Sequence, residues 1–438
     1  MLRRLFAVAI CALIAGCNSQ SSAPVNALPN AQLPGAGGSP IAPNNVNELP
    51  EPPVIHAVHG VAEVNLIADL NPATGLPGFD YNGMHGVAPT INLKPGETIV
   101  FNLADNLRRG GMASFMNLHF HGMGSTPLAP GDDVLGMFAT PGHSVRYSIH
   151  IPKNQPPGLY WYHPHIHGQT NFQVGQSGMS GAIVVDGLEH HLPGLGAMKQ
   201  RLIIVRDTGV GANAIPAPQE DSMDGMDMGG APVGKPHLIN NDPCGPEVGL
   251  LVSVNGALQP VITIPPGEQQ FFRVINATGH KTMKLAVDGE SLQLVAVDGF
   301  ALDTNPKNPP TETLPYIIVP PAARAEFVVT GQAHATKFRT ACYDSGSGGD
   351  RDPNVVLAKI APPAHHGDVR FEQPKPLKVG APLPSNYYTT PLPAATTKRT
   401  VVFSEGPRHF LIDHKVFNIN SPPEFVVHTG TVEEWHIA

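Results

Sequence analysis

One short pattern occurs three times in this chain and restricts its fold more than any other feature. Each copy has a turn glycine, an aromatic residue five positions later and an aliphatic residue two positions after that. Alternate side chains of a β-strand point to the same face, so the last two residues mark one apolar face of a strand. The copies are K-P-G-E-T-I-V-F-N-L with Gly96, Phe101 and Leu103; P-P-G-E-Q-Q-F-F-R-V with Gly267, Phe272 and Val274; and H-T-G-T-V-E-E-W-H-I with Gly430, Trp435 and Ile437. An internal repeat at this domain-sized spacing predicts tandem β-domains.

Composition supports an all-β chain. The sequence has 46 glycines and 47 prolines, which leaves little room for long helices. From about residue 56, short runs such as V-A-E-V-N-L-I-A and G-A-I-V-V-D recur between turn signals, which favours antiparallel β-sandwiches. The formal charge is −8, with no basic cluster beyond the N-terminus, so nucleic acid is not an expected partner.

The first two copies continue alike, through the frame M-x-L-x-x-x-G. In the first copy this reads M-N-L-H-F-H-G, with His119 and His121, and in the second it reads M-K-L-A-V-D-G and ends at Gly289. We expect two related domains, of which only the first carries histidines here. In the third copy the matching position would fall beyond Ala438, so we expect a third domain that begins near residue 396 and breaks off, too short to bury its own core.

The expected organisation therefore has five parts. They are residues 1–17 as a signal peptide, 18–55 as a disordered Pro/Asn-rich tether, 56–190 as a first domain with the histidine motifs, 191–395 as a second domain without them, and 396–438 as the beginning of a third.

The N-terminus reads as a targeting segment. Arg3 and Arg4 precede an apolar stretch, Leu5–Ala15, that is too short to span a bilayer. The stretch ends L-I-A-G-C, which resembles a bacterial lipobox and predicts a lipid on Cys17 that anchors the chain to a membrane. An ordinary secretory signal is the alternative. Both interpretations predict an exported protein, periplasmic or anchored at the outer membrane.

Only two cysteines, Cys244 and Cys342, remain after export and lipidation. In an oxidising compartment they could form one disulfide, although spacing in the sequence does not show whether they meet.

Two H-x-H pairs carry the chemistry of the first domain: His119 with His121, and His163 with His165. Residues two apart in a strand lie roughly 6.5–7 Å apart, too far to chelate one ion comfortably. Each pair therefore suits two neighbouring ions, and two such strands face to face would present four imidazoles to a cluster. Imidazole suits copper, zinc, iron and nickel, while the lack of nearby cysteines disfavours structural zinc.

The motif H-x-H-G at His119–Gly122 and the motif Y-H-x-H at Tyr162–His165 resemble the copper motifs of the multicopper oxidase family, laccase-like enzymes built from cupredoxin domains. The resemblance covers nearly all of residues 56–438. It implies an all-β fold of tandem cupredoxin-like Greek-key sandwiches, two complete and the start of a third. It also implies copper as the cofactor, with O₂ and a small-molecule or metal-ion reductant as partners; the state of oligomerisation stays open.

The same resemblance implies a role for each histidine. His119 resembles a ligand of the type 2 copper, and His121, His163 and His165 resemble ligands of the type 3 pair. In the family this trinuclear cluster reduces dioxygen to water.

The family's other motifs, H-P-x-H-x-H and H-C-H-x-x-x-H, do not occur in this sequence. They supply the other cluster histidines and the type 1 blue copper, which needs a thiolate with two imidazoles. We therefore expect a C-terminally truncated family member that is inactive alone as an oxidase and binds copper weakly. The alternatives are a non-catalytic copper-binding or copper-handling exported lipoprotein, and a structural relative whose histidines no longer bind metal.

Weaker signals are left with two interpretations each. His167 extends the histidine row, either as a ligand or a group supporting the ligands, or as an ordinary loop residue; the loop residue is favoured. Asp132 and Asp133 either relay protons or are solvated turn acids, the latter being favoured by P-G-D-D. The tract 221–230 contains Met223, Met226 and Met228, which either bind Cu(I) through their thioethers or belong to an ordinary flexible loop; the loop is favoured.

Overall fold

The computed structural model describes most of the chain after residue 47. The described ranges are 48–72, 75–109, 112–113, 115–167, 169–208, 242–245, 251–305, 307–346, 349–364, 377–383, 392–405, 410–416, 418 and 421–438. Cys17 and the methionine tract 221–230 lie outside the described residues. Within these ranges no helix is long and apolar enough to cross a bilayer.

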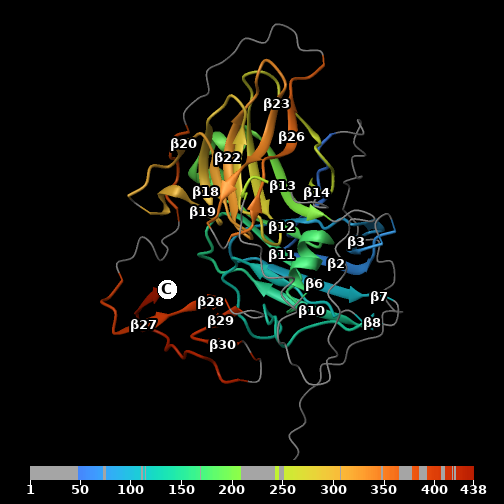
Figure 1. The fold of residues 1–438 in the computed structure, drawn as a ribbon, viewed down its shortest axis with the longest axis vertical. Coiled ribbons are helices and arrows are strands. Elements are labelled where there is room, and N and C mark those ends of the chain that lie inside the picture. The colour runs from blue at the N-terminus through green and yellow to red at the C-terminus, as the bar shows by residue number, and fades with distance from the viewer. Residues whose placement is uncertain are drawn as a thin grey trace, which may run out of the picture.

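Two five-stranded sheets form a first sandwich (Figure 1). One sheet has the order β1-β5-β12-β11-β9, with β1 Val54–His56, β5 Thr90–Leu93, β12 Gly181–Val185, β11 Gly158–His163 and β9 His119–His121. The other has the order β10-β6-β2-β3-β4, with β10 Ser144–His150, β6 Thr98–Asp105, β2 Val61–Leu70, β3 Pro77–Tyr81 and β4 Met84–His85. A small hairpin, β7 Arg108–Arg109 and β8 Met112–Ala113, extends from it. The inner faces share one core that includes Phe101, Phe120 and Tyr162, all fully buried.

A second sandwich follows. Its larger sheet has the order β14-β13-β16-β22-β18-β19, with β20 also paired to β18; these are β14 Leu251–Val254, β13 Lys199–Thr208, β16 Gln269–Asn276, β22 Arg324–Thr330, β18 Leu292–Val297, β19 Phe300–Ala301 and β20 Glu312–Leu314. The facing sheet has the order β15-β26-β23-β17-β21, with β15 Val261–Thr263, β26 Val355–Ala361, β23 Thr336–Ala341, β17 Met283–Val287 and β21 Ile317–Val319. A short pair, β24 Tyr343–Asp344 and β25 Arg351–Asp352, lies beyond β23. Cys342, beside that pair, forms a disulfide with Cys244.

Among the described residues, helical structure is confined to short turns. They are a π-helical turn at Phe172–Gln176, α1 at Leu188–His191, and 3₁₀ turns at Pro193–Ala197 and Leu302–Thr304. The expectation of an all-β fold built from cupredoxin-like sandwiches is confirmed. The sheets are mixed, however, because β2 and β13 pair in parallel with β6 and β16.

The repeat in the sequence is also a repeat in the structure. Its glycines have φ angles of 90°, 79° and 83°, a left-handed conformation that glycine adopts without strain. The strands that follow, β6, β16 and β31 (Glu433–Ile437), each pair in parallel with a preceding strand, which is β27 (Thr397–Val401) in the third case. The same ten-residue pattern therefore corresponds to the same pair of parallel strands at three places in the chain.

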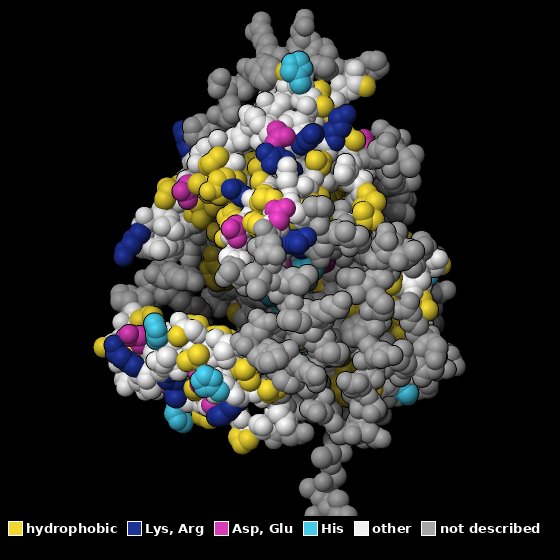
Figure 2. Space-filling view, viewed as in Figure 1, with side chains coloured by type: hydrophobic (Ala, Val, Ile, Leu, Met, Phe, Trp, Pro, Cys, Tyr) yellow, Lys and Arg dark blue, Asp and Glu magenta, His cyan; other side chains and the backbone are white. Residues whose placement is uncertain are grey.

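The third copy differs from the others in burial. Phe101 and Phe272 are fully buried, whereas Trp435 at the matching position is 42% exposed. The strands β6 and β16 also pair on their second edge with β10 and β22, while β31 has only β27 as a neighbour among the described strands. The remaining strands of this segment form a small sheet, β28 Phe403–Glu405, β29 Phe410–Ile412 and β30 Lys415–Val416, and hydrophobic side chains lie on its surface (Figure 2).

The expected tether ends earlier than residue 55. Leu49 is only 5% exposed and packs in the core of the second sandwich, where its N–H bonds to the carbonyl of Val261. Glu51 pairs with Arg201 of β13 at 2.7 Å. The prediction of disorder through residue 55 was wrong for these residues, because an apolar side chain and a carboxylate in a polar stretch find partners on a different domain.

Candidate metal centre

Two neighbouring strands bring the four predicted histidines together. The first motif forms β9, and the second lies at the end of β11 and in the turn after it. These strands are antiparallel, with His119 directly opposite His163 and His121 directly opposite Trp161. The two H-x-H segments therefore lie side by side in one sheet, and not face to face as expected.

The ring nitrogens are close enough to share metal ions. Ligand nitrogens of His119, His121 and His163 all lie within 4.8 Å of one another. Nδ1 of His121 is 3.4 Å from Nε2 of His163. Two imidazole nitrogens at about 2.0–2.1 Å from one ion and at a tetrahedral angle are about 3.3–3.4 Å apart. The pair therefore fits a single ion across the two strands.

Hydrogen bonds on the far side of two rings select the nitrogen that faces the centre. Nδ1 of His119 donates to the carboxylate of Asp132 at 3.0 Å, and Nδ1 of His163 donates to the carbonyl of Pro164 at 2.8 Å. Each bond leaves Nε2 without its proton, in the tautomer that binds a metal ion.

His165 has an open coordination position of its own. Its backbone N–H donates to Oδ1 of Asn117 at 2.7 Å, which fixes the turn. Its Nδ1 is buried and has no hydrogen-bond partner among the described residues. Its ring lies 5.4 Å from that of His119. A buried imidazole nitrogen without a partner is costly unless something binds it, so this atom also fits a metal.

Burial keeps three of these imidazoles neutral. It lowers the pKa of His121 to about 3, with the charge of Arg324 adding to the effect. Burial also holds the pKa of His163 well below its usual range and lowers that of His165. A neutral imidazole is the form that donates a lone pair, so a metal does not have to displace protons from these three rings near neutral pH.

Trp161 is a part of the site that the sequence did not reveal. Its ring is 4.1 Å from that of His163 and 5.2 Å from that of His121, at interplanar angles of 31° and 27°. The side chain is 2% exposed. Its position opposite His121 in the β9–β11 register is the only signal for this role, and that register is not readable from the sequence.

Asp132 and Asp133 have different surroundings in the structure. The expectation of a solvated turn acid was wrong for Asp132, whose side chain is 12% exposed and accepts bonds from His119 and from the N–H of Phe120. Asp133 instead accepts the N–H of Gly136 at 2.8 Å, as a turn acid does. The ring of His167 is 5.5 Å from that of His165, and it lies outside the group of three close ligands.

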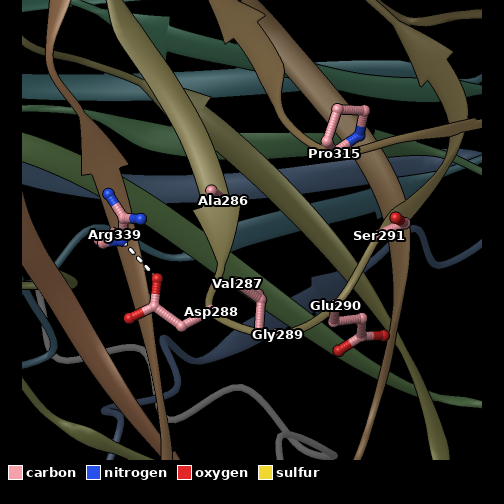
Figure 3. Close-up of a pocket in the computed structure, with 8 residues that line it drawn as sticks. All are labelled: Ala286, Val287, Asp288, Gly289, Glu290, Ser291, Pro315 and Arg339. Atoms are coloured by element: carbon pink, nitrogen blue, oxygen red, sulfur yellow. Dashed lines mark hydrogen bonds and ion pairs between the residues drawn. The ribbon is translucent and has the colours of Figure 1, made fainter.

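The matching place in the second sandwich has a different lining. Ala286 stands where the first has His119, and Arg339 lies opposite it in β23. Asp288 stands where the first has His121, and it pairs with Arg339 (Figure 3). This open pocket contains no imidazole.

Comparison with known proteins agrees with this fold. Models of the multicopper oxidase family match residues 68–190 and residues 213–358, which together make up more than half of the chain. The chain belongs to the multicopper oxidase family, whose members are copper-dependent oxidoreductases that use O₂.

The relatives are distant and longer. An iron transport multicopper oxidase of Epichloe festucae is 27% identical over 216 residues, 48% of this chain and 30% of the relative. A laccase of Bacillus subtilis is 25% identical over 322 residues, 66% of this chain and 58% of the relative. The chain thus spans about a third to three fifths of these proteins. A multicopper oxidase structure from Campylobacter jejuni, described as a metallo-oxidase, has a TM-score of 0.62 at 21% identity, covers 89% of this chain and 79% of its own, and shares the fold.

Proposed function

We propose that this chain is the copper-binding portion of an oxidase that couples one-electron oxidation of a substrate to reduction of dioxygen to water at a trinuclear copper cluster. The observation that carries the proposal is the set of four imidazoles on β9, β11 and the following turn, three of which have ligand nitrogens within 4.8 Å of one another. A phenol or a metal ion is the proposed reductant, and the names of the relatives, a laccase and an iron transport oxidase, support those two classes.

In this proposal His119 binds the type 2 copper, and His121, His163 and His165 bind the type 3 pair. Bound copper would supply the one-electron steps that dioxygen reduction needs. The protein supplies the geometry: Asp132 holds the ring of His119, and the carbonyl of Pro164 holds that of His163. We assign Asp132 to orienting His119, in preference to relaying protons, because its carboxylate already accepts two bonds.

We also propose that the 438-residue chain does not turn over by itself. A type 1 site needs a cysteine thiolate, and Cys244 and Cys342 are joined in a disulfide. The cluster needs more imidazoles than the four found here. The exposed face of β31, whose counterparts in β6 and β16 are buried, is consistent with further strands that join this segment.

A non-catalytic copper-binding lipoprotein is the second candidate. The disulfide favours it, since neither of those cysteines offers a thiolate for electron entry. Export, and a membrane anchor through a lipid on Cys17, stay proposals based on the sequence alone.

Copper content and oxygen uptake test the proposed copper site and the proposed inactivity of the chain alone. The chain is loaded with Cu²⁺, copper per chain and the blue absorption band are measured, and O₂ consumption is followed with a phenol. We expect bound copper, no intense blue band and no sustained O₂ uptake. The variants H119A and H165A should lose copper, whereas the control H150A, an exposed histidine of β10, should not. Equal copper in all variants contradicts the assigned site, and sustained phenol oxidation contradicts the proposed inactivity.

A further inference from the structure

The strand that carries His163 pairs with β12 along its length, but the start of its other edge, toward β9, is unpaired. β11 pairs with β9 at Trp161 and His163, but β9 has already ended where it would face Leu159. Residues two apart in a strand direct their backbone groups to the same edge, so the N–H and C=O of Leu159 point toward the missing partner. Leu159 is fully buried, so these groups need partners other than water.

Two side chains of the second sandwich supply those partners. Oε2 of Glu326 accepts the N–H of Leu159 at 3.0 Å, and Nε of Arg324 donates to its carbonyl at 3.2 Å. Both come from β22 and sit two residues apart on one face of that strand. One acceptor and one donor thus take the place of a paired residue on β9. We call Arg324 and Glu326 the β22 clamp.

The β22 clamp is itself held rigidly. Glu326 is 1% exposed and pairs with Arg273 of β16 at 2.6 Å. Arg324 is 4% exposed; its Nη2 donates to the carbonyl of Asp298 at 2.9 Å, and its Nη1 lies 3.1 Å from the carboxylate of the same residue. Because other residues of the second sandwich hold these two side chains in place, the side chains cannot move with β11 and therefore fix the position of that strand.

The clamp also reaches the turn after the first histidine motif. A Cβ on Gly122 would lie 2.6 Å from Nη2 of Arg324 and 3.0 Å from the ring of Tyr160. The turn that ends β9 therefore packs directly on the guanidinium group. Arg324 thus touches both histidine-bearing segments of the first sandwich, the end of H-F-H-G and the start of β11.

We propose that Arg324 and Glu326 are positioning residues for the copper centre, through which the second sandwich fixes the separation between β9 and β11. The inference rests on the proposed function, because it assigns a purpose to the clamp only if the four histidines bind copper. Trp161 lies between the clamp and the ligands, two residues from Leu159 and two from His163, and it reports on both.

The test uses Trp161 as the sole tryptophan. The chain has two tryptophans, so W435F makes a parent whose emission comes from Trp161 alone. Cu²⁺ is titrated, and the apparent Kd is taken from quenching of that emission. R324K keeps the charge but removes the planar guanidinium, which bonds Leu159 through Nε and Asp298 through Nη2. R201K is the matched control: Arg201 is 7% exposed and donates from Nε within the second sandwich, away from β11.

We expect R324K to weaken Cu²⁺ binding about tenfold, which is the lower end of the effect of removing a group that supports metal ligands. We also expect it to change the hyperfine splitting of the bound Cu²⁺ in electron paramagnetic resonance. R201K should leave both unchanged. D298N, which removes an exposed ion-pair partner and keeps an acceptor for the N–H of Arg324, should give a smaller change in the same direction and covers the case in which R324K does not fold.

Two results overturn the inference in distinguishable ways. If Cu²⁺ does not quench the Trp161 emission of the W435F parent saturably, the proposed copper site is contradicted, and the positioning role of the β22 clamp fails with it. If the parent binds Cu²⁺, and R324K and D298N have the same Kd and the same resonance spectrum as the parent, only the positioning role of the β22 clamp is contradicted. The proposed copper site is then unaffected.

Discussion

Substituting Gly122 by alanine should destabilise the protein more than the same change at Gly289. The two glycines end the same M-x-L-x-x-x-G frame in the two sandwiches, and their φ angles are 81° and 80°. A methyl group in this left-handed conformation costs roughly 1–2 kcal/mol at either position. The backbone cost is therefore matched, and any difference comes from what surrounds the new atom.

The surroundings are unlike. Nothing lies within 4 Å of a Cβ at Gly289, while one at Gly122 meets Nη2 of Arg324 at 2.6 Å and Tyr160 at 3.0 Å. The guanidinium cannot simply move away, because it is buried and bonded to Leu159. Overpacking of this kind costs about 1–3 kcal/mol. We expect losses in unfolding free energy of about 1–2 kcal/mol for G289A and about 2–5 kcal/mol for G122A.

Urea unfolding followed by circular dichroism measures both variants on the same chain. For G122A, the emission of Trp161 in a W435F background reports separately on the first sandwich. If G122A proves no less stable than G289A, the close packing of Arg324 on the H-F-H-G turn is wrong, and the positioning role loses one of its two contacts. A deficit confined to G122A supports it.

Three further outcomes are expected. D132N should weaken Cu²⁺ binding by about 10- to 100-fold, measured by competition titration, because it removes the carboxylate that fixes the ring of His119; an unchanged affinity contradicts that role. Burial raises the pKa of Asp105 to about 7, so the folded state keeps a proton that the unfolded state has lost, and stability falls as pH rises from about 4 to about 8. D105N should reduce this loss of stability between pH 5 and pH 8. If the urea midpoints of the wild-type protein and of D105N decline equally between these two pH values, the role assigned to Asp105 is wrong. C342S, which opens a disulfide to Cys244 across 98 residues, should cost about 2–4 kcal/mol in urea unfolding, and an unchanged midpoint would show that the bond contributes little.

The fold was readable from the sequence because its signals are local. A turn glycine followed by apolar residues at spacing two specifies a strand and its buried face without reference to the rest of the chain. That pattern located β6, β16 and β31 correctly, and the aligned M-x-L-x-x-x-G frame located the turns at Gly122 and Gly289. Parallel pairing of these strands with β2, β13 and β27 was not predicted, since neighbours in a sheet depend on tertiary packing.

The site was only partly readable for the same reason. Each H-x-H pair is local, but the register that sets His119 opposite His163 is not, and it also decides that Trp161 stacks on the rings. Asp132 was misjudged because a P-G-D-D turn is polar in most settings, whereas here the loop returns to β9 and the carboxylate meets a ring N–H and a backbone N–H. Arg324 is more than 150 residues from either motif, and nothing in its surroundings in the sequence marks it.

The two sandwiches are related in sequence, but their contributions to the centre are complementary. The second has alanine and aspartate at the positions of the two histidines in β9, and Arg339 faces them where the first has His163. An ion pair between Asp288 and Arg339 occupies that place, so neither of these two charges is unpaired. On its other sheet, the same sandwich presents Arg324 and Glu326 to the backbone of β11. A copy without the two histidines thus contributes to its neighbour, because it completes the edge of the strand that holds His163. Under the proposal above, the copper site on β9 and β11 depends on that edge staying in register.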